Sequence, residues 1–82
     1  MFAQNTYVIR TARLADVPRI ARLGWLYDDT WPRGPILVGE LEGTVAAALA
    51  VDENRAVCAA VPGAALLLAH LRARAAGQGL LG

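Results

Sequence analysis

The stretch Pro35-Ile-Leu-Val-Gly-Glu-Leu-Glu-Gly-Thr-Val-Ala-Ala-Ala-Leu-Ala-Val51 contains two apolar runs separated by Glu42-Gly43. Gly43 accepts the positive φ that a tight turn requires, so the stretch predicts a β-hairpin with those two residues as its loop. This loop defines a register of opposed pairs: Leu41 with Thr44, Glu40 with Val45, Val38 with Ala47, and Ile36 with Leu49.

Both faces of the predicted hairpin are apolar. An antiparallel sheet with one face in water alternates apolar and polar side chains, so two apolar faces predict a sheet that is covered on each side. The sequence therefore predicts a small α/β (α+β) sandwich with the hairpin at its centre. One predicted face carries Ile36, Val38, Val45, Ala47 and Leu49, and the other carries Leu37, Leu41, Ala46 and Ala48.

The length and composition predict a single domain over residues 1–82, with flexible ends at 1–6 and 77–82. Hydrophobic residues make up 56% of the chain and charged residues 18%, a balance that argues against disorder. Much of the hydrophobic content is alanine, which buries little area. The core is therefore small for a chain on its own, and we expect the protein to associate with a second copy.

Charge and cysteine content narrow the class of protein. A formal net charge of +1 gives no electrostatic basis for binding nucleic acid or an acidic membrane. A single cysteine, Cys58, cannot form an internal disulfide. The apolar segment 56–71 is interrupted at Pro62-Gly63 and is shorter than the ~20 residues that span a bilayer, and residues 1–10 lack the features of a signal peptide. These features predict a soluble cytoplasmic protein.

The rest of the chain supplies two strands and two helices, giving the order β-α-β-β-β-α. Residues 7–11 contain β-branched residues that are typical of a strand, so they predict a first strand. Residues 56–61 predict a strand after the hairpin. Asp16 is a suitable N-cap for a helix over residues 17–27, with Pro18 in its first turn. The alanine-rich and leucine-rich segment 64–76 predicts a second helix.

The second predicted helix has two apolar faces. One contains Ala64, Leu67, Leu68, Leu71 and Ala75, and the opposite one contains Ala65, Leu66, Ala69, Ala73 and Ala76. A surface helix normally carries polar residues opposite its core-facing stripe. The second face therefore predicts a homo-oligomer, with a two-fold dimer as the commonest closed form. Its predicted interface residues are Leu66, Ala69 and Ala73.

Two segments resemble GNAT-type N-acetyltransferases. The run Ile9-Arg10-Thr11-Ala12-Arg13, with Asp16 and then Ile20-Ala21-Arg22-Leu23, is similar to the opening strand and helix of that superfamily. The run from Leu37 to Ala47 is similar to the hairpin that follows. The resemblance covers about residues 7–51, the first half of the fold, and implies an architecture more than a chemistry.

The resemblance also implies a loop for the pyrophosphate of acetyl-CoA, written Gln/Arg-x-x-Gly-x-Gly/Ala, after the next strand. The corresponding junction here is Val61-Pro-Gly-Ala-Ala65, with one glycine and no arginine. Gly63, Ala64 and Ala65 are its weak candidate cofactor residues. The string Arg74-Ala-Ala-Gly-Gln-Gly79 matches the loop pattern but follows a helix, so it predicts a helix C-cap and tail.

The remaining candidate residues do not form a catalytic or metal-binding motif. His70 has no nucleophilic serine partner, because the chain contains no serine. His70 and Cys58 together supply only two ligands, whereas a metal site needs three or four. Glu40 is either a surface carboxylate beside Arg10 or Arg55, or a buried one suited to general-base work. A second set of residues, the aromatic side chains Trp25, Tyr27 and Trp31, suits either a core or an interface.

Three hypotheses for function remain. The first is a non-catalytic, GNAT-like interaction or assembly module without a catalytic residue, a metal or a cofactor. The alternative is an acyl-CoA-dependent N-acetyltransferase whose missing half comes from another chain, with acetyl-CoA as its cofactor. A small-ligand binding domain is the third. The poorly matched phosphate loop favours the first.

Overall fold

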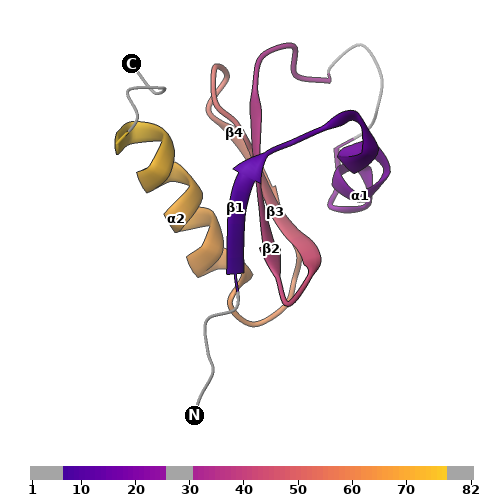
Figure 1. Ribbon diagram of the computed structural model, residues 1–82, viewed down its shortest axis with the longest axis vertical. Helices are drawn as coiled ribbons and strands as arrows, with labels where there is room; N and C mark the ends of the chain where they lie inside the picture. The colour runs from indigo at the N-terminus through magenta and orange to yellow at the C-terminus, as the bar shows by residue number, and fades with distance from the viewer. Residues whose placement is uncertain (1–6, 26–30, 78–82) are drawn as a thin grey trace.

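The computed structural model describes residues 7–25 and 31–77. One four-stranded antiparallel sheet has the order β1-β2-β3-β4, and Figure 1 shows the helices α1 and α2 on its opposite faces. The predicted α+β class and the β-α-β-β-β-α order are confirmed. The elements are β1 (Tyr7–Thr11), the 3₁₀ helix η1 (Leu14–Asp16), α1 (Val17–Arg22), β2 (Ile36–Leu41), β3 (Thr44–Ala50), β4 (Arg55–Cys58) and α2 (Ala64–Gly77).

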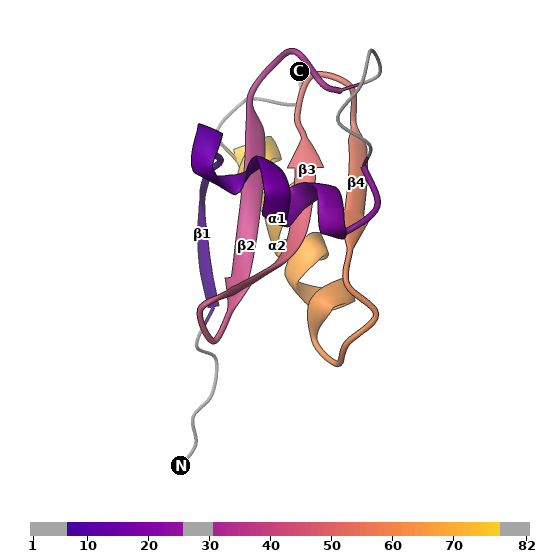
Figure 2. The same ribbon diagram turned by 90° about the vertical axis from the view of Figure 1, so that its right-hand side faces the viewer.

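The sheet separates two apolar clusters, as the doubly apolar hairpin predicts. Figure 2 shows α1 crossing in front of β2 and β3, with α2 behind the sheet. The α2-side cluster contains Leu37, Ala46, Ala47, Leu49, Val51, Ala64, Leu67, Leu71 and Ala75. The α1-side cluster contains Ile20, Trp25, Ile36, Val38, Val45, Ala48 and Ala50.

The hairpin register agrees with the prediction near the turn and departs from it farther along. Leu41 faces Thr44 and Glu40 faces Val45, as predicted. The register then shifts between Gly39 and Glu40, so that one extra residue, Ala46, is inserted in β3. The predicted pairs of Val38 with Ala47 and Ile36 with Leu49 are therefore wrong. Their observed partners are Ala48 and Ala50.

This β-bulge decides which side chains meet each helix. Side chains alternate along a strand, so one inserted residue reverses every later position. Ala47 and Leu49 consequently join the α2-side cluster, and Ala48 joins the α1-side cluster, opposite to the predicted faces. The bulge therefore supplies Leu49 to the face that packs against the leucines of α2.

Gly39 of β2 lies directly against the Leu67 side chain of α2. A Cβ atom on Gly39 would lie 2.7–2.9 Å from three side-chain carbon atoms of Leu67. Real Cβ atoms do not approach carbon atoms so closely, and Leu67 is buried at 2% exposure. The missing side chain of Gly39 therefore lets the leucine face of α2 lie against β2.

The first helix is shorter than predicted. It ends at Arg22, not near Tyr27, and Gly24 follows with φ +126°. The amide of Leu23 bonds to the Ile20 carbonyl, three residues back, so the helix tightens and stops there. Tyr27 lies outside the described residues.

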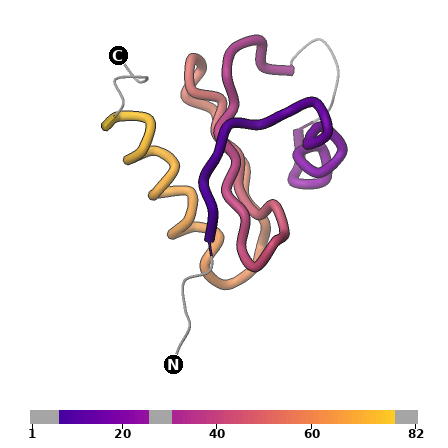
Figure 3. Tube along the Cα trace, viewed as in Figure 1, coloured from indigo at the N-terminus to yellow at the C-terminus, as the bar shows by residue number. Residues whose placement is uncertain are grey.

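The strand predicted for residues 56–61 is also shorter. Strand β4 begins one residue earlier, at Arg55, and ends at Cys58, although the Ala59 amide still bonds to the Ala46 carbonyl at 2.8 Å. The chain then turns into α2 through Gly63, whose φ is +90° (Figure 3). At the other end, α2 includes Gly77, which we predicted to be part of a flexible tail. Neither α1 nor α2, within the described ranges, has the length and hydropathy of a membrane-spanning helix.

Candidate functional site

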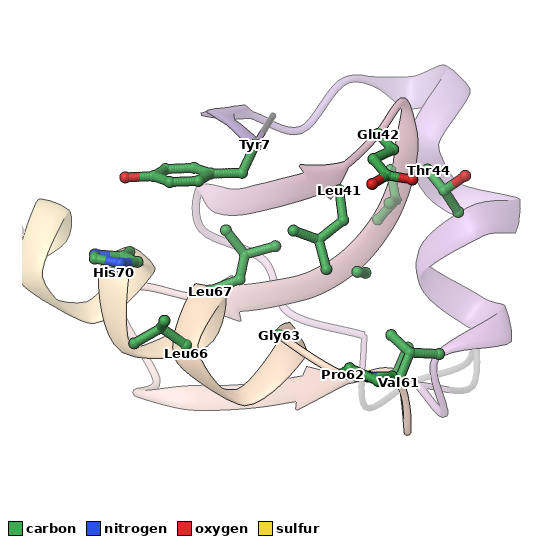
Figure 4. A pocket seen from close by; sticks show the side chains of 13 residues that line it. Tyr7, Leu41, Glu42, Thr44, Val61, Pro62, Gly63, Leu66, Leu67 and His70 are labelled. Atoms are coloured by element: carbon green, nitrogen blue, oxygen red, sulfur yellow. The ribbon is translucent and has the colours of Figure 1, made fainter. Parts of the chain in front are cut away.

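A groove of about 950 Å³ lies between the start of β1, the tip of the β2–β3 hairpin and the start of α2 (Figure 4). Its position follows from the fold, because α2 crosses the sheet and leaves the hairpin tip uncovered. Most of its lining is apolar, including Leu41, Ala59, Val61, Pro62, Leu66 and Leu67. Volume and lining are both typical of sites for small molecules.

Two stacked rings border one end of this groove. The Tyr7 and His70 rings are nearly parallel, with an interplanar angle of 11° and centroids 5.2 Å apart. Figure 4 shows both rings beside Leu67 and away from Gly63. His70 is half-buried on α2, consistent with a partly exposed helix-face histidine. The stack joins β1 to α2, and no spacing signal in the sequence predicts it because its members are 63 positions apart.

The candidate cofactor residues Gly63, Ala64 and Ala65 lie at the turn into α2. Gly63 lines the groove, Ala64 is fully buried and Ala65 is exposed. The Ala64 amide donates to the Val61 carbonyl at 3.2 Å, within the turn itself. The strand–turn–helix order suits a phosphate loop.

The charge in the groove does not suit a pyrophosphate. Among the described lining residues, Glu42 is the only Asp, Glu, Lys or Arg. Its carboxylate repels an anionic ligand, and no lining guanidinium or ammonium compensates for it. The neighbouring Pro62 also has no N–H to donate. The groove can accept an apolar body more readily than a diphosphate.

The predicted interface residues share one exposed surface on α2. Ala69 and Ala73 are exposed, and 64% of the Leu66 surface is accessible. We call the surface formed by Ala65, Leu66, Ala69, Ala73 and Ala76 the outer α2 face. Leu66 also lines the groove, so the groove and the outer α2 face are continuous.

A buried ion pair connects β1 to the start of α1. The Arg10 guanidinium donates from Nη1 and Nη2 to the two Asp16 carboxylate oxygens, at 2.7 and 2.9 Å. It also donates from Nε to Glu40 Oε2 at 2.8 Å. The side chain of Asp16 is 1% exposed and that of Arg10 is 22% exposed. Such a bidentate pair fixes the position of both side chains.

The electrostatics of this pair stabilise both charges. The Arg10 guanidinium, assisted by the backbone N–H of Arg13, holds the pKa of the Asp16 carboxyl well below its usual value, although burial opposes this. Hydrogen bonds to Asp16 and then to Glu40 raise the pKa of Arg10. Asp16 therefore carries a negative charge throughout the neutral pH range.

These contacts correct one prediction and choose between two others. Asp16 is at the N-cap position of α1 but makes no side-chain capping bond to it, and its carboxylate instead accepts the Arg13 amide at 2.7 Å. Glu40 is paired with Arg10, one of the two partners the sequence offered. That ion pair favours the structural interpretation of Glu40 over a general base.

The remaining candidates are structural. Cys58 is half-buried and packs against the α2-side cluster. Trp25 is buried in the α1-side cluster and meets the half-buried Trp31 edge-on, with centroids 6.1 Å apart. Within residues 7–25 and 31–77, no group of three or more His, Cys, Asp or Glu side chains could hold a metal ion. Arg74 to Gly77 belong to α2, and Gln78 and Gly79 lie outside the described residues.

Comparison of the chain with protein-family models, curated proteins and solved structures found no match.

Proposed function

We propose that the protein is a non-catalytic assembly module of the cytoplasm that forms a two-fold homodimer through the outer α2 face. The observation that carries the proposal is the exposure of this face, where Leu66 and the alanines at positions 65, 69, 73 and 76 are all exposed. Small side chains allow two such helices to approach closely. A second copy is the occupant that needs no other protein and gives a closed assembly.

Two further features support self-association. Strand β4 ends the sheet order, and its outer edge pairs with no other strand of the described chain. Unpaired edges favour addition of another strand unless they are protected. The core is also rich in alanine on both faces of the sheet, so burial between chains adds stability that a single chain lacks.

Sedimentation equilibrium of the full chain at tens of micromolar tests the proposal. We expect a dimer for the native sequence and a folded monomer for Ala69→Arg or Ala73→Arg, because each buries an unpaired cation at the interface. Ala15→Arg is the matched control, since it adds the same charge at an exposed alanine on the opposite side of the sheet. A native monomer of 8.7 kDa would refute the proposal.

The acyl-CoA alternative rests on the strand–turn–helix junction at Gly63. The negative charge of Glu42 and the proline before Gly63 weigh against it. Calorimetric titration with acetyl-CoA distinguishes the two functions, and we expect no measurable heat of binding at physiological concentrations. A micromolar dissociation constant would favour the transferase with a complementing chain over the assembly module.

A further inference from the structure

Several of the large exposed hydrophobic side chains of the described residues lie around the groove. Tyr7, Val8, Leu14, Val61 and Leu66 are the large hydrophobic side chains exposed among residues 7–25 and 31–77. Three of them, Tyr7, Val61 and Leu66, line the groove. Scattered apolar side chains are normal on a protein surface, but a concentration around one concavity indicates a binding site.

The groove has a floor and walls that come from different elements. Leu41 of β2 and Leu67 of α2 lie side by side in Figure 4, and Leu66 lies below Leu67. The Tyr7–His70 stack stands at one end, and Val61 with Pro62 stands at the other. A molecule seated along this line would contact apolar carbon over its length and the edge of an aromatic pair at one end.

Charge restricts the ligand. Glu42 lies on the hairpin tip beside Thr44, and it is the carboxylate of the groove described above. No Lys or Arg lines the groove among the described residues. A carboxylate at the rim lowers affinity for anions and raises it for cations, by an amount that solvent screening keeps modest.

We propose that this groove binds an apolar small molecule with an aromatic or similarly flat body and a neutral or cationic end group, oriented with that end towards Glu42. The volume of about 950 Å³ is at the upper end of the range for small-molecule sites, so a two-ring body fits without displacing the chain. Leu66 also belongs to the outer α2 face, so we expect the same binding in Ala73→Arg, the variant expected to be monomeric.

Three probes with the same naphthalene body test the proposal: 2-naphthylethylamine, 2-naphthylethanol and 2-naphthylacetate. Binding to the full chain is followed near neutral pH by amide chemical shifts. We expect the largest shifts at Thr44 and Gly63, which line the groove, and none at Gly24, which lies after α1. The amine should bind about threefold to tenfold more tightly than the acetate, and the alcohol should be intermediate.

Two substitutions separate the charge from the apolar walls. Glu42→Gln should bring the amine-to-acetate ratio close to one, whereas Glu53→Gln, which removes a charge outside the groove, should leave it unchanged. Val61→Ala should weaken all three probes by about threefold to tenfold, since it removes one apolar wall at an exposed position that lies outside the outer α2 face. Circular dichroism confirms that each variant is folded.

Three results would overturn the proposal. The first is the absence of shifts at Thr44 and Gly63 with all probes at their solubility limits. The second is a set of shifts centred on residues outside the groove. The third is tighter binding of the acetate than of the amine in the native chain.

Discussion

The two faces of the sheet hold their helices by different means. On one face, the 14-residue α2 places four side chains at 0–2% exposure, namely those of Ala64, Leu67, Leu71 and Ala75. On the other, the six-residue α1 buries only Ile20, and the preceding turn is fixed by the pair of Asp16 with Arg10. The comparison shows that apolar burial holds most of α2, with an exposed hydrogen bond from Arg72 to Asn54 and the Tyr7–His70 stack beside it, whereas α1 depends on a buried charge.

The difference follows from helix length. A helix of six residues has fewer than two turns, so it presents one or two side chains to a sheet and is not stable in isolation. The bidentate contact with Arg10 fixes the entry to α1 without needing a longer apolar stripe. Trp25, beyond α1, adds area to the same cluster, and the Arg55 guanidinium lies 5.5 Å from the centroid of its ring.

The largest expected effect is on the α2 side. Leu71→Ala should lower the free energy of unfolding by about 3–4 kcal/mol, because it leaves a cavity in the α2-side cluster at a side chain with no exposed area. Urea denaturation measures the change. Leu66→Ala, on the opposite side of the same helix, should alter it by less than about 0.5 kcal/mol when both changes are made in the Ala73→Arg background, where no partner covers Leu66. Equal losses in both variants would contradict the assignment of the buried face.

The next effect concerns the α1 side. Asp16→Asn should lower the free energy of unfolding by about 3 kcal/mol, since it removes the more deeply buried of the two carboxylates that pair with the Arg10 guanidinium. The exposed pair of Arg55 with Glu53 is the matched control. Glu53→Gln should change stability by less than about 0.5 kcal/mol. A small loss in Asp16→Asn would mean that apolar packing, not the ion pair, holds α1.

The Asp16 carboxylate makes the free energy of unfolding depend on pH in a defined direction. Its pKa in the folded protein lies well below the unfolded value of about 3.9, so the unfolded chain binds more protons on acidification. The contribution is fully present above about pH 5 and is lost as the pH falls through the unfolded and then the folded pKa. Denaturation curves from pH 6 to pH 2 should show this slope, and Asp16→Asn should flatten it. An unchanged slope would assign the acid sensitivity to other carboxylates.

An intermediate effect is expected where α2 meets β2. Gly39→Ala should lower the free energy of unfolding by about 1–3 kcal/mol, because its Cβ would overlap the buried Leu67 side chain. The double variant Gly39→Ala with Leu67→Ala makes room for the new methyl group. The double variant should lose less free energy of unfolding than the sum of the losses in the two single variants. Strict additivity of the losses would show that the two positions do not touch.

The sequence predicted the fold class and the hairpin register next to the turn, but not the register beyond the bulge or the pair of Asp16 with Arg10. Element order followed from apolar periodicity and from Gly43, both of which are local signals. The position of the bulge at Ala46 is not determined by a local sequence signal. Nothing in a run of alanines marks the extra residue, and the choice is made by packing Leu49 against α2. Asp16 was predicted as a helix cap from its neighbours alone, whereas its partner Arg10 lies on a strand and is brought close only by the turn.

The groove was only partly predictable for the same reason. Gly63 and Leu66 were singled out for separate reasons, as a cofactor position and as an interface position. The fold places them in one concavity with Tyr7, which no pattern in the sequence associates with them. Residues that are distant in sequence define this site, and single-sequence periodicity reports only on residues within one element.

The smallest expected effect lies in the hairpin turn, which both faces share. Glu42 and Gly43 have φ values of 52° and 86°, so both turn residues occupy the left-handed region. Glycine adopts it freely and asparagine tolerates it, but glutamate does not favour it. Glu42→Asn should therefore raise the free energy of unfolding by about 0.5 kcal/mol.

The hairpin turn connects two strands that contribute to both clusters. The gain from Glu42→Asn should therefore be the same in the Leu71→Ala and Asp16→Asn backgrounds, as is usual for independent sites. Glu42→Gln removes the charge without supplying the turn preference, so it should leave stability unchanged within about 0.3 kcal/mol. An equal gain from Gln and Asn would instead attribute the effect to charge, and a gain in only one background would show that the turn is coupled to a single face.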